Sequence, residues 1–191
     1  MHRLSTTFIL GYHGCDQDTA EALLAGRDFL PSANDYDWLG HGIYFWEANP
    51  ERGLEFAQEA SRRSSRHVRI PAVIGAVIDL GLCLDLTSSR GVDQVAAAYR
   101  LLRDMAAINR TALPNNNPDG LRRNLDCAVV NTLHDTLSAG GDNPFDTVRG
   151  IFTEGPPLYA GSGFHERTQV QVCVRTLSCT KGVFRVPQAA R

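Results

Sequence analysis

The most regular alternation of apolar and polar residues lies in the segment RTQVQVCVR, residues 167–175. Side chains alternate between the two faces of a strand, so this segment predicts a strand with a valine face that packs into the core. The valine face holds Thr168, Val170, Val172 and Val174, and the opposite face holds Gln169, Gln171 and Cys173. The opposite face has two interpretations: a sheet surface in contact with water, or a pair of amides presented to a ligand.

Shorter apolar patterns predict the other elements. Clusters of β-branched and aromatic residues indicate strands, and apolar residues at helical spacing indicate helices. The expected strands are 43–45, 71–80, 147–153, 182–186 and 6–12. The expected helices are one capped at 16 or 18 that runs to about 25, one that starts at 49–50, one at 88–109, and one that begins at 124 or 126 and runs to about 137. The glycine- and proline-rich residues 154–166 are expected to form a long loop. This order predicts a mixed α+β fold rather than regular βαβ units.

Composition narrows the class of protein. A length of 191 residues with 43% hydrophobic residues favours one domain with its own core. The formal net charge of -2 gives no overall basic character for binding nucleic acid. The five cysteines are odd in number and widely spaced, which is typical of unpaired thiols in a reducing compartment and not of a zinc site. With no apolar run of membrane-spanning length, we expect a cytoplasmic protein that does not enter a membrane.

Several common catalytic motifs do not occur in the sequence. No Gly-x-Gly-x-x-Gly follows an expected strand, and there is no P-loop, His-Glu-x-x-His or Gly-x-Ser-x-Gly motif. A Rossmann-type dinucleotide site is therefore not supported.

Two short segments carry candidate site residues. His13-Gly14 follows the first expected strand, and Gly40-His41-Gly42 leads into Ile43-Tyr44-Phe45. Glycines allow the backbone to approach a ligand closely, and an aromatic ring just after such a turn can cover a planar group. Taken singly, His13 and Tyr44 are also typical of residues that pack in a core.

In combination these segments resemble the diphtheria-toxin-like ADP-ribosyltransferase family, in its poly(ADP-ribose) polymerase branch. The similarity consists of His13-Gly14 at a strand end, the Gly-x-Gly-Ile-Tyr-Phe segment at 40–45, and a following helix that carries Phe56. It covers residues 8–86 and resumes at 147–186. The resemblance implies that residues 1–191 form a single catalytic domain. That domain would have central, split, mostly antiparallel β-sheets flanked by helices, and residues 87–146 would be a helical insertion.

The resemblance also implies a substrate and residue roles. The family cleaves NAD at its nicotinamide–ribose bond and transfers ADP-ribose, with no metal. His13 would bind the adenosine-side ribose, and the Gly14 backbone would hold the nicotinamide carboxamide. Tyr44 would stack on the nicotinamide ring, and Phe56 would cover its other face.

The third family residue is normally a glutamate on a late strand, and this sequence departs from that pattern. Gln171 takes the catalytic place and Gln169 the helper place, with Gln169 as the second choice for catalysis. Because an amide carries no charge to stabilise a cationic transition state, mono-ADP-ribosylation is favoured over chain building. The acceptor would be a protein or a nucleic acid.

Three other functions stay open at this point. They are hydrolysis of NAD, an inactive module that binds NAD or ADP-ribose, and a structural or interaction domain. Small stand-alone proteins of this class act as toxins or as regulators, and the sequence does not choose between these roles. The arginines at 122, 123 and 149 are candidates either for NAD phosphates or for structural ion pairs.

Overall fold

The structure is a computed structural model that describes residues 8–62, 68–118 and 120–187. The expected strand positions Thr6 and Thr7 lie outside the described residues. Within these ranges there are seven strands and four α-helices. The strands are β1 (Phe8–Asp16), β2 (Ile43–Glu47), β3 (Pro71–Asp79), β4 (Cys83–Asp85), β5 (Thr147–Pro157), β6 (His165–Val174) and β7 (Thr180–Arg185). The helices are α1 (Gln17–Leu24), α2 (Pro50–Ser61), α3 (Ser89–Asn109) and α4 (Asn124–Gly140), and a short 3-10 helix spans Leu177–Cys179.

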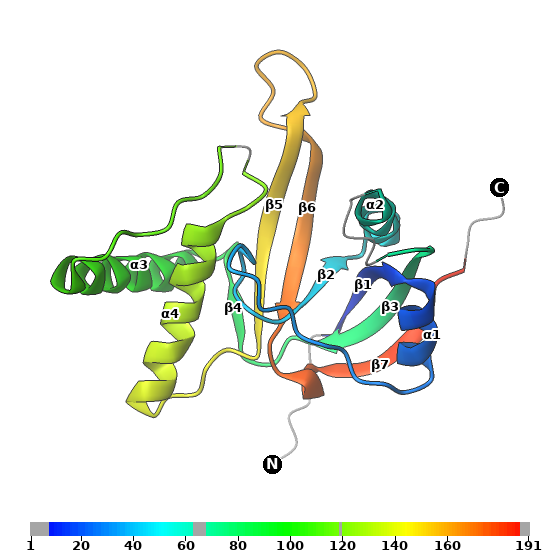
Figure 1. Ribbon diagram of the computed structural model, residues 1–191, viewed down its shortest axis with the longest axis horizontal. Coiled ribbons are helices and arrows are strands. Elements are labelled where there is room, and N and C mark those ends of the chain that lie inside the picture. The colour runs from blue at the N-terminus through cyan, green and yellow to red at the C-terminus, as the bar shows by residue number, and fades with distance from the viewer. Residues whose placement is uncertain (1–7, 63–67, 119, 188–191) are drawn as a thin grey trace.

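The seven strands form one sheet in the order β4-β5-β6-β2-β1-β3-β7. All neighbours are antiparallel except β4 and β5, which are parallel. The α3 and α4 pair lies beyond the β4 end of the sheet, whereas α1 and α2 lie near β1 and β3 (Figure 1). The α+β class with mostly antiparallel strands is thus confirmed.

The shortest ladder of the sheet joins the central strand β2 to its neighbour β1. β1 and β2 pair only at Gly11 with Glu47 and at Tyr12 with Trp46. β1 nevertheless pairs with β3 over its whole length, from Phe8 to Asp16. This continuous pairing explains why β1 runs on past the expected end at Tyr12. Beyond Tyr12 the sheet is therefore open between β1 and β2.

Two apolar clusters cover the two faces of the sheet. On one face Phe45 and Val172 are fully buried together with Leu23 of α1. On the other face Cys173 packs with Val130 of α4. The predicted alternation along β6 is confirmed, because Val172 and Val174 share the first cluster while Cys173 lies in the second. The glutamine face is not wet, however: Gln169 is 6% and Gln171 9% exposed.

Helix α2 begins where the sequence indicates. The side chain of Asn49 accepts a hydrogen bond from the backbone N–H of Arg52, and Pro50 occupies the first turn. The helix then packs directly on β1, since a Cβ on Gly14 would collide with the carbonyl oxygen of Gly53. Gly14 is therefore needed for this close approach of helix and strand.

The region expected to be a loop at 154–166 is mostly strand. β5 continues to Pro157 and β6 begins at His165, so the two strands form a long hairpin that projects beyond the rest of the sheet (Figure 1). Pairing between Glu154 and Arg167 extends the ladder in spite of Gly155 and Pro156. Glu154 thus stands on a strand, which determines where its side chain points.

Candidate functional site

A cavity of about 790 Å³ opens beside the gap between β1 and β2. Its lining includes five of the six residues predicted from the sequence: His13, Gly14, Tyr44, Phe56 and Gln171. The sixth, Gln169, stands on β6 beside the cavity and opposite Phe152, which does line it. The volume lies within the range of small-molecule sites.

His13 crosses the gap between the two central strands. Its Nδ1 lies 2.9 Å from the carbonyl oxygen of Tyr44. Because a carbonyl only accepts, Nδ1 carries the proton, and in the neutral ring Nε2 is left as an acceptor. Burial lowers the pKa of His13, and the hydrogen bond to Tyr44 opposes this shift. A neutral ring with a free acceptor suits a hydroxyl group of a ligand.

Gly14 presents its backbone to the gap. The carbonyl oxygen of Leu10 accepts from the N–H of Ala48, just after β2, at 2.9 Å. Backbone polar groups alternate in direction along a strand, so those of Tyr12 and Gly14 also face the β2 side. The next partner of Gly14 in this ladder would be Tyr44, whose carbonyl is bonded to His13 instead. The N–H and C=O of Gly14 therefore point into the opening, as a bound carboxamide would require.

The hydroxyl group of Tyr44 is held by two hydrogen bonds. Its hydroxyl accepts from the N–H of Leu39 at 2.9 Å and donates to the carbonyl of Gly40 at 2.8 Å. Gly40 has φ 80°, a left-handed conformation that favours glycine. Burial raises the pKa of Tyr44 well above its ordinary value, so the hydroxyl stays neutral. The ring is a rigid wall of the cavity, and Phe56 forms another wall with its ring 5.0 Å from that of Trp46.

The two β6 amides have partners within the protein. The Nε1 of Trp38 donates to the Oε1 of Gln171 at 2.7 Å, so the acceptor oxygen of this amide is already engaged. The Nε2 of Gln169 lies 3.4 Å from the Oε2 of Glu154. Gln171 is thus left to offer mainly its N–H groups to a ligand.

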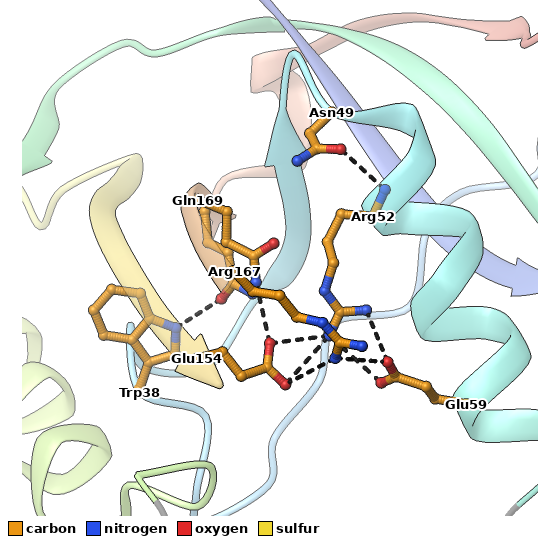
Figure 2. A network of polar contacts seen from close by, with 8 residues as sticks. Trp38, Asn49, Arg52, Glu59, Glu154, Arg167 and Gln169 are labelled. Carbon is orange, nitrogen blue, oxygen red and sulfur yellow. Dashed lines mark hydrogen bonds and ion pairs between the residues drawn. The ribbon is translucent and has the colours of Figure 1, made fainter. Parts of the chain in front are cut away.

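A charged cluster at the cavity was not anticipated from the sequence (Figure 2). Arg52 is 6% exposed, and its Nη2 lies 3.1 Å from Glu154 and 3.4 Å from Glu59. Arg167 also contacts both carboxylates, at 2.9 Å from Glu59 and 3.6 Å from Glu154. Arg52, Glu59 and Glu154 line the cavity. We call these four residues the Arg52 cluster.

Helical spacing in the sequence indicates two of the four residues of the Arg52 cluster, Arg52 and Glu59. Arg52, Phe56 and Glu59 are separated by four and three residues, so they share one face of α2. With Phe56 expected at the site, Arg52 and Glu59 were predictable neighbours. Glu154 gave no such signal because its segment was assigned to a loop.

The arginines proposed from the sequence have different surroundings. Arg122 lines the cavity and lies over the ring of Tyr36, 5.1 Å from its centroid. Arg149 pairs instead with Glu47 at 2.6 Å and with Asp85 at 3.4 Å, which is a structural role. Arg123 lies over Phe152, 4.4 Å from the ring centroid. Of the three, Arg122 alone stays a candidate for ligand phosphates.

Two further findings concern other classes of site. Within residues 8–62, 68–118 and 120–187, no group of three or more His, Cys, Asp or Glu side chains is arranged to hold a metal ion. Of the helices in that part of the chain, none has the length and apolar character needed to cross a bilayer.

The fold and the cavity define an α+β protein with a ligand-sized site where its central strands part. The chain is similar to a protein of Methanocaldococcus jannaschii named "Uncharacterized protein MJ0359", at 30% identity over 189 residues. The aligned stretch covers 89% of this chain and 83% of that relative. The chain therefore belongs to the same family as MJ0359. No family model matches the chain, and no solved structure matches it.

Proposed function

We propose that this protein cleaves the nicotinamide–ribose bond of NAD and transfers ADP-ribose to a macromolecular acceptor, as a mono-ADP-ribosyltransferase. The observation that carries this proposal is the common cavity of His13, Gly14, Tyr44, Phe56 and Gln171. These residues come from segments that are far apart in the sequence. Each is identified in the sequence by a local motif, and all of them line one cavity in the folded chain.

The backbone geometry supports the nicotinamide end of this proposal. A carboxamide needs one acceptor and one donor, and Gly14 directs both its C=O and its N–H into the gap. The fixed ring of Tyr44 provides an aromatic face, and stacking on such a face contributes about 0.5–1.5 kcal/mol beyond area burial. Holding the scissile bond in one orientation is the larger benefit of this arrangement.

The neutral His13 supports the ribose end. Its Nε2 is an acceptor in the tautomer that the Tyr44 carbonyl selects, and ribose hydroxyls are donors. Cavity residues thus match both a planar carboxamide and a sugar.

A second function, an NAD-binding module without turnover, is favoured by one specific contact. The acceptor oxygen of Gln171, at the predicted catalytic place, is bonded to Trp38. An amide in this state brings no charge to the reaction, and one of the two lone pairs of its oxygen is already engaged.

The test is an incubation of the purified full chain with adenine-labelled NAD and with protein and nucleic-acid acceptors. Label on a macromolecule is the expected result. Free ADP-ribose without labelled acceptor would indicate hydrolysis instead. NAD that raises the unfolding temperature without being cleaved would favour the binding module.

A variant pair ties the result to the cavity. Tyr44→Ala should lose NAD binding, whereas Tyr99→Ala, which removes a half-exposed tyrosine on α3, should retain it. Equal NAD affinity in both variants would contradict the proposed site. Tyr44→Phe, which keeps the ring, checks that loss of binding does not follow from the lost hydroxyl contacts to Leu39 and Gly40.

A further inference from the structure

The cavity contains a carboxylate that contacts side chains rather than backbone groups. Glu154 has a side chain that is 13% exposed, and it contacts the side chains of Arg52, Arg167 and Gln169. Two of the other carboxylates that line the cavity accept hydrogen bonds from backbone N–H groups instead. Asp16 accepts from the N–H groups of Asp18, Arg69 and Ile70. Asp37 accepts from the N–H of Asn34.

Glu154 stands beside the positions where the reaction was expected to need a carboxylate. Strand pairing puts Gly150 opposite Gln171, Phe152 opposite Gln169, and Glu154 opposite Arg167. Directly paired residues point to the same face of a sheet, so Glu154 shares a face with both glutamines. On this face the Nε2 of Gln169 donates a hydrogen bond to the Oε2 of Glu154, at 3.4 Å (Figure 2).

Two donors on residues that line the cavity lack a partner within the described residues. They are the Nε of Arg52 and the Nε1 of Trp46, both buried, on residues that are 6% and 5% exposed. The guanidinium carbon of Arg52 lies 5.6 Å from the centroid of the Trp46 ring, and both residues line the cavity. A buried donor without a partner is costly unless a ligand or water satisfies it. A hydroxyl group has the chemistry to bridge Glu154 and the Nε of Arg52, because it can donate to a carboxylate and accept from such a donor.

We infer that Glu154, on β5, is the catalytic carboxylate of this protein, in place of either glutamine on β6. This inference rests on the proposed cleavage of NAD. The C–N bond between the ribose C1′ and nicotinamide breaks, and its electron pair leaves with nicotinamide, whose ring becomes neutral. Positive charge develops on the ribose, and Glu154 stabilises it while accepting a hydrogen bond from a ribose hydroxyl. The acceptor's nucleophilic atom forms the new bond to C1′, and its proton passes to solvent.

The rest of the Arg52 cluster holds this carboxylate in place. Arg52 and Arg167 each contact both Glu154 and Glu59, so the two positive charges are shared between two negative ones. Gln169 becomes a positioning residue that donates to Glu154. Fixed charge of this kind costs no reorganisation during the reaction.

The experiment compares Glu154→Gln with Glu166→Gln in the full chain. Glu166 is an exposed carboxylate on the same hairpin and does not line the cavity. Release of nicotinamide from NAD and the affinity for NAD are measured on both, with thermal unfolding as a check of folding. We expect E154Q to bind NAD within threefold of wild type and to release nicotinamide about 100-fold more slowly. E166Q should match wild type in both respects.

The outcomes separate this assignment from the proposed function. If wild type turns over NAD and E154Q keeps the wild-type rate, Glu154 is not the catalytic carboxylate, while the transferase proposal stands. If wild type releases no nicotinamide, both are overturned. Should E154Q fail to fold, Glu154→Asp takes its place, because it keeps the charge that faces Arg52 but withdraws it by one methylene. A tenfold or greater loss of rate then supports the assignment, and an unchanged rate overturns it.

Discussion

The Nδ1 of His13 donates to the carbonyl oxygen of Tyr44, 2.9 Å away, where the β1–β2 ladder would otherwise continue. The His13 side chain thus occupies the Tyr44 carbonyl that would otherwise pair with Gly14, and the backbone groups of Gly14 stay available to a ligand. The same bond selects the tautomer that puts an acceptor at Nε2. The gap in the sheet and the chemistry of its edge therefore depend on a single contact.

The first prediction separates these two tasks of His13. In His13→Asn the amide N–H can replace Nδ1 as a donor to Tyr44, but nothing replaces Nε2. We expect an unfolding midpoint close to wild type and an NAD affinity reduced about tenfold, the equivalent of about 1.4 kcal/mol for one lost hydrogen bond. His13→Ala should lower both the unfolding midpoint and the affinity for NAD. Calorimetric titration with NAD and thermal unfolding measure the two effects. An H13N variant with wild-type affinity would show that Nε2 does not contact NAD.

The second prediction concerns the contact between β1 and α2. Gly14→Ala drives a methyl group into the carbonyl of Gly53, which should cost about 1–3 kcal/mol of stability through overpacking. The shift of α2 should also weaken NAD binding, because Phe56 and Arg52 move with the helix. Gly182→Ala is the matched control, since a Cβ on this strand glycine meets nothing within 4 Å. Equal unfolding temperatures for G14A and G182A would argue against close packing at Gly14.

A third prediction tests the balance of charge in the Arg52 cluster. Arg52→Met removes the buried partner of Glu154 and Glu59 and leaves them with the more exposed Arg167, so we expect a cost of about 3 kcal/mol, at the low end for a broken buried pair. Adding Glu154→Gln removes one of the stranded charges, so the double variant should be more stable than R52M alone. Chemical denaturation of the single and double variants measures this coupling.

An exposed pair provides the control for that experiment. Arg185 and Glu21 form an ion pair with side chains that are 65% and 46% exposed. Because solvent screens such pairs, Arg185→Met should leave the unfolding midpoint near that of wild type. Equal stability of R52M and R185M would contradict the buried ion pairs of Arg52 with Glu59 and Glu154.

The fourth prediction is a dependence of stability on pH. His134 is 2% exposed, and burial lowers its pKa from the ordinary value of 6.5 to about 4, opposed by its hydrogen bond to Val130. Arg175 lowers this pKa further, and Asp135 raises it. Below pH 6.5 the unfolded chain binds a proton that the folded chain does not, so stability falls as the pH drops from 6.5 to 4.

The size of this effect follows from the shift. At 1.36 kcal/mol per pKa unit, His134 accounts for a loss of about 3 kcal/mol across that window. His134→Leu should therefore lose less stability than wild type between pH 7 and pH 4, as measured by urea unfolding at both values. Burial also lowers the pKa of His13, so the dependence of stability on pH should be weaker in H134L but still present. Parallel pH profiles for wild type and H134L would contradict the assignment.

Much of the fold was accessible from local patterns. Asn49 and Pro50 start α2 as predicted, because capping depends on residues within one turn. The faces of β6 follow from alternation alone, and Val172 and Cys173 lie in different clusters as expected. The α3 helix begins after Ser88, whose hydroxyl accepts from the N–H of Gly91. Each of these features is decided by neighbours in the sequence.

Features that depend on distant partners were missed. β4 is three residues long and exists through its parallel pairing with β5, which comes after α3 and α4 in the chain. The β5–β6 hairpin extends through a glycine and prolines because Glu154 and Arg167 still pair across it. Local propensity marks such residues as loop, and tertiary pairing overrides it.

By itself, the sequence identified part of the candidate site, because short motifs around His13 and Tyr44 and the alternation of Gln169 and Gln171 are local properties. It did not determine which carboxylate accompanies them. That was decided by tertiary structure, since Glu154 reaches Gln169 and Arg52 only when β5 pairs with β6 and α2 packs over the sheet. Charges separated by about a hundred residues along the chain have no signature in it, and they meet only through the pairing and packing of the elements that carry them.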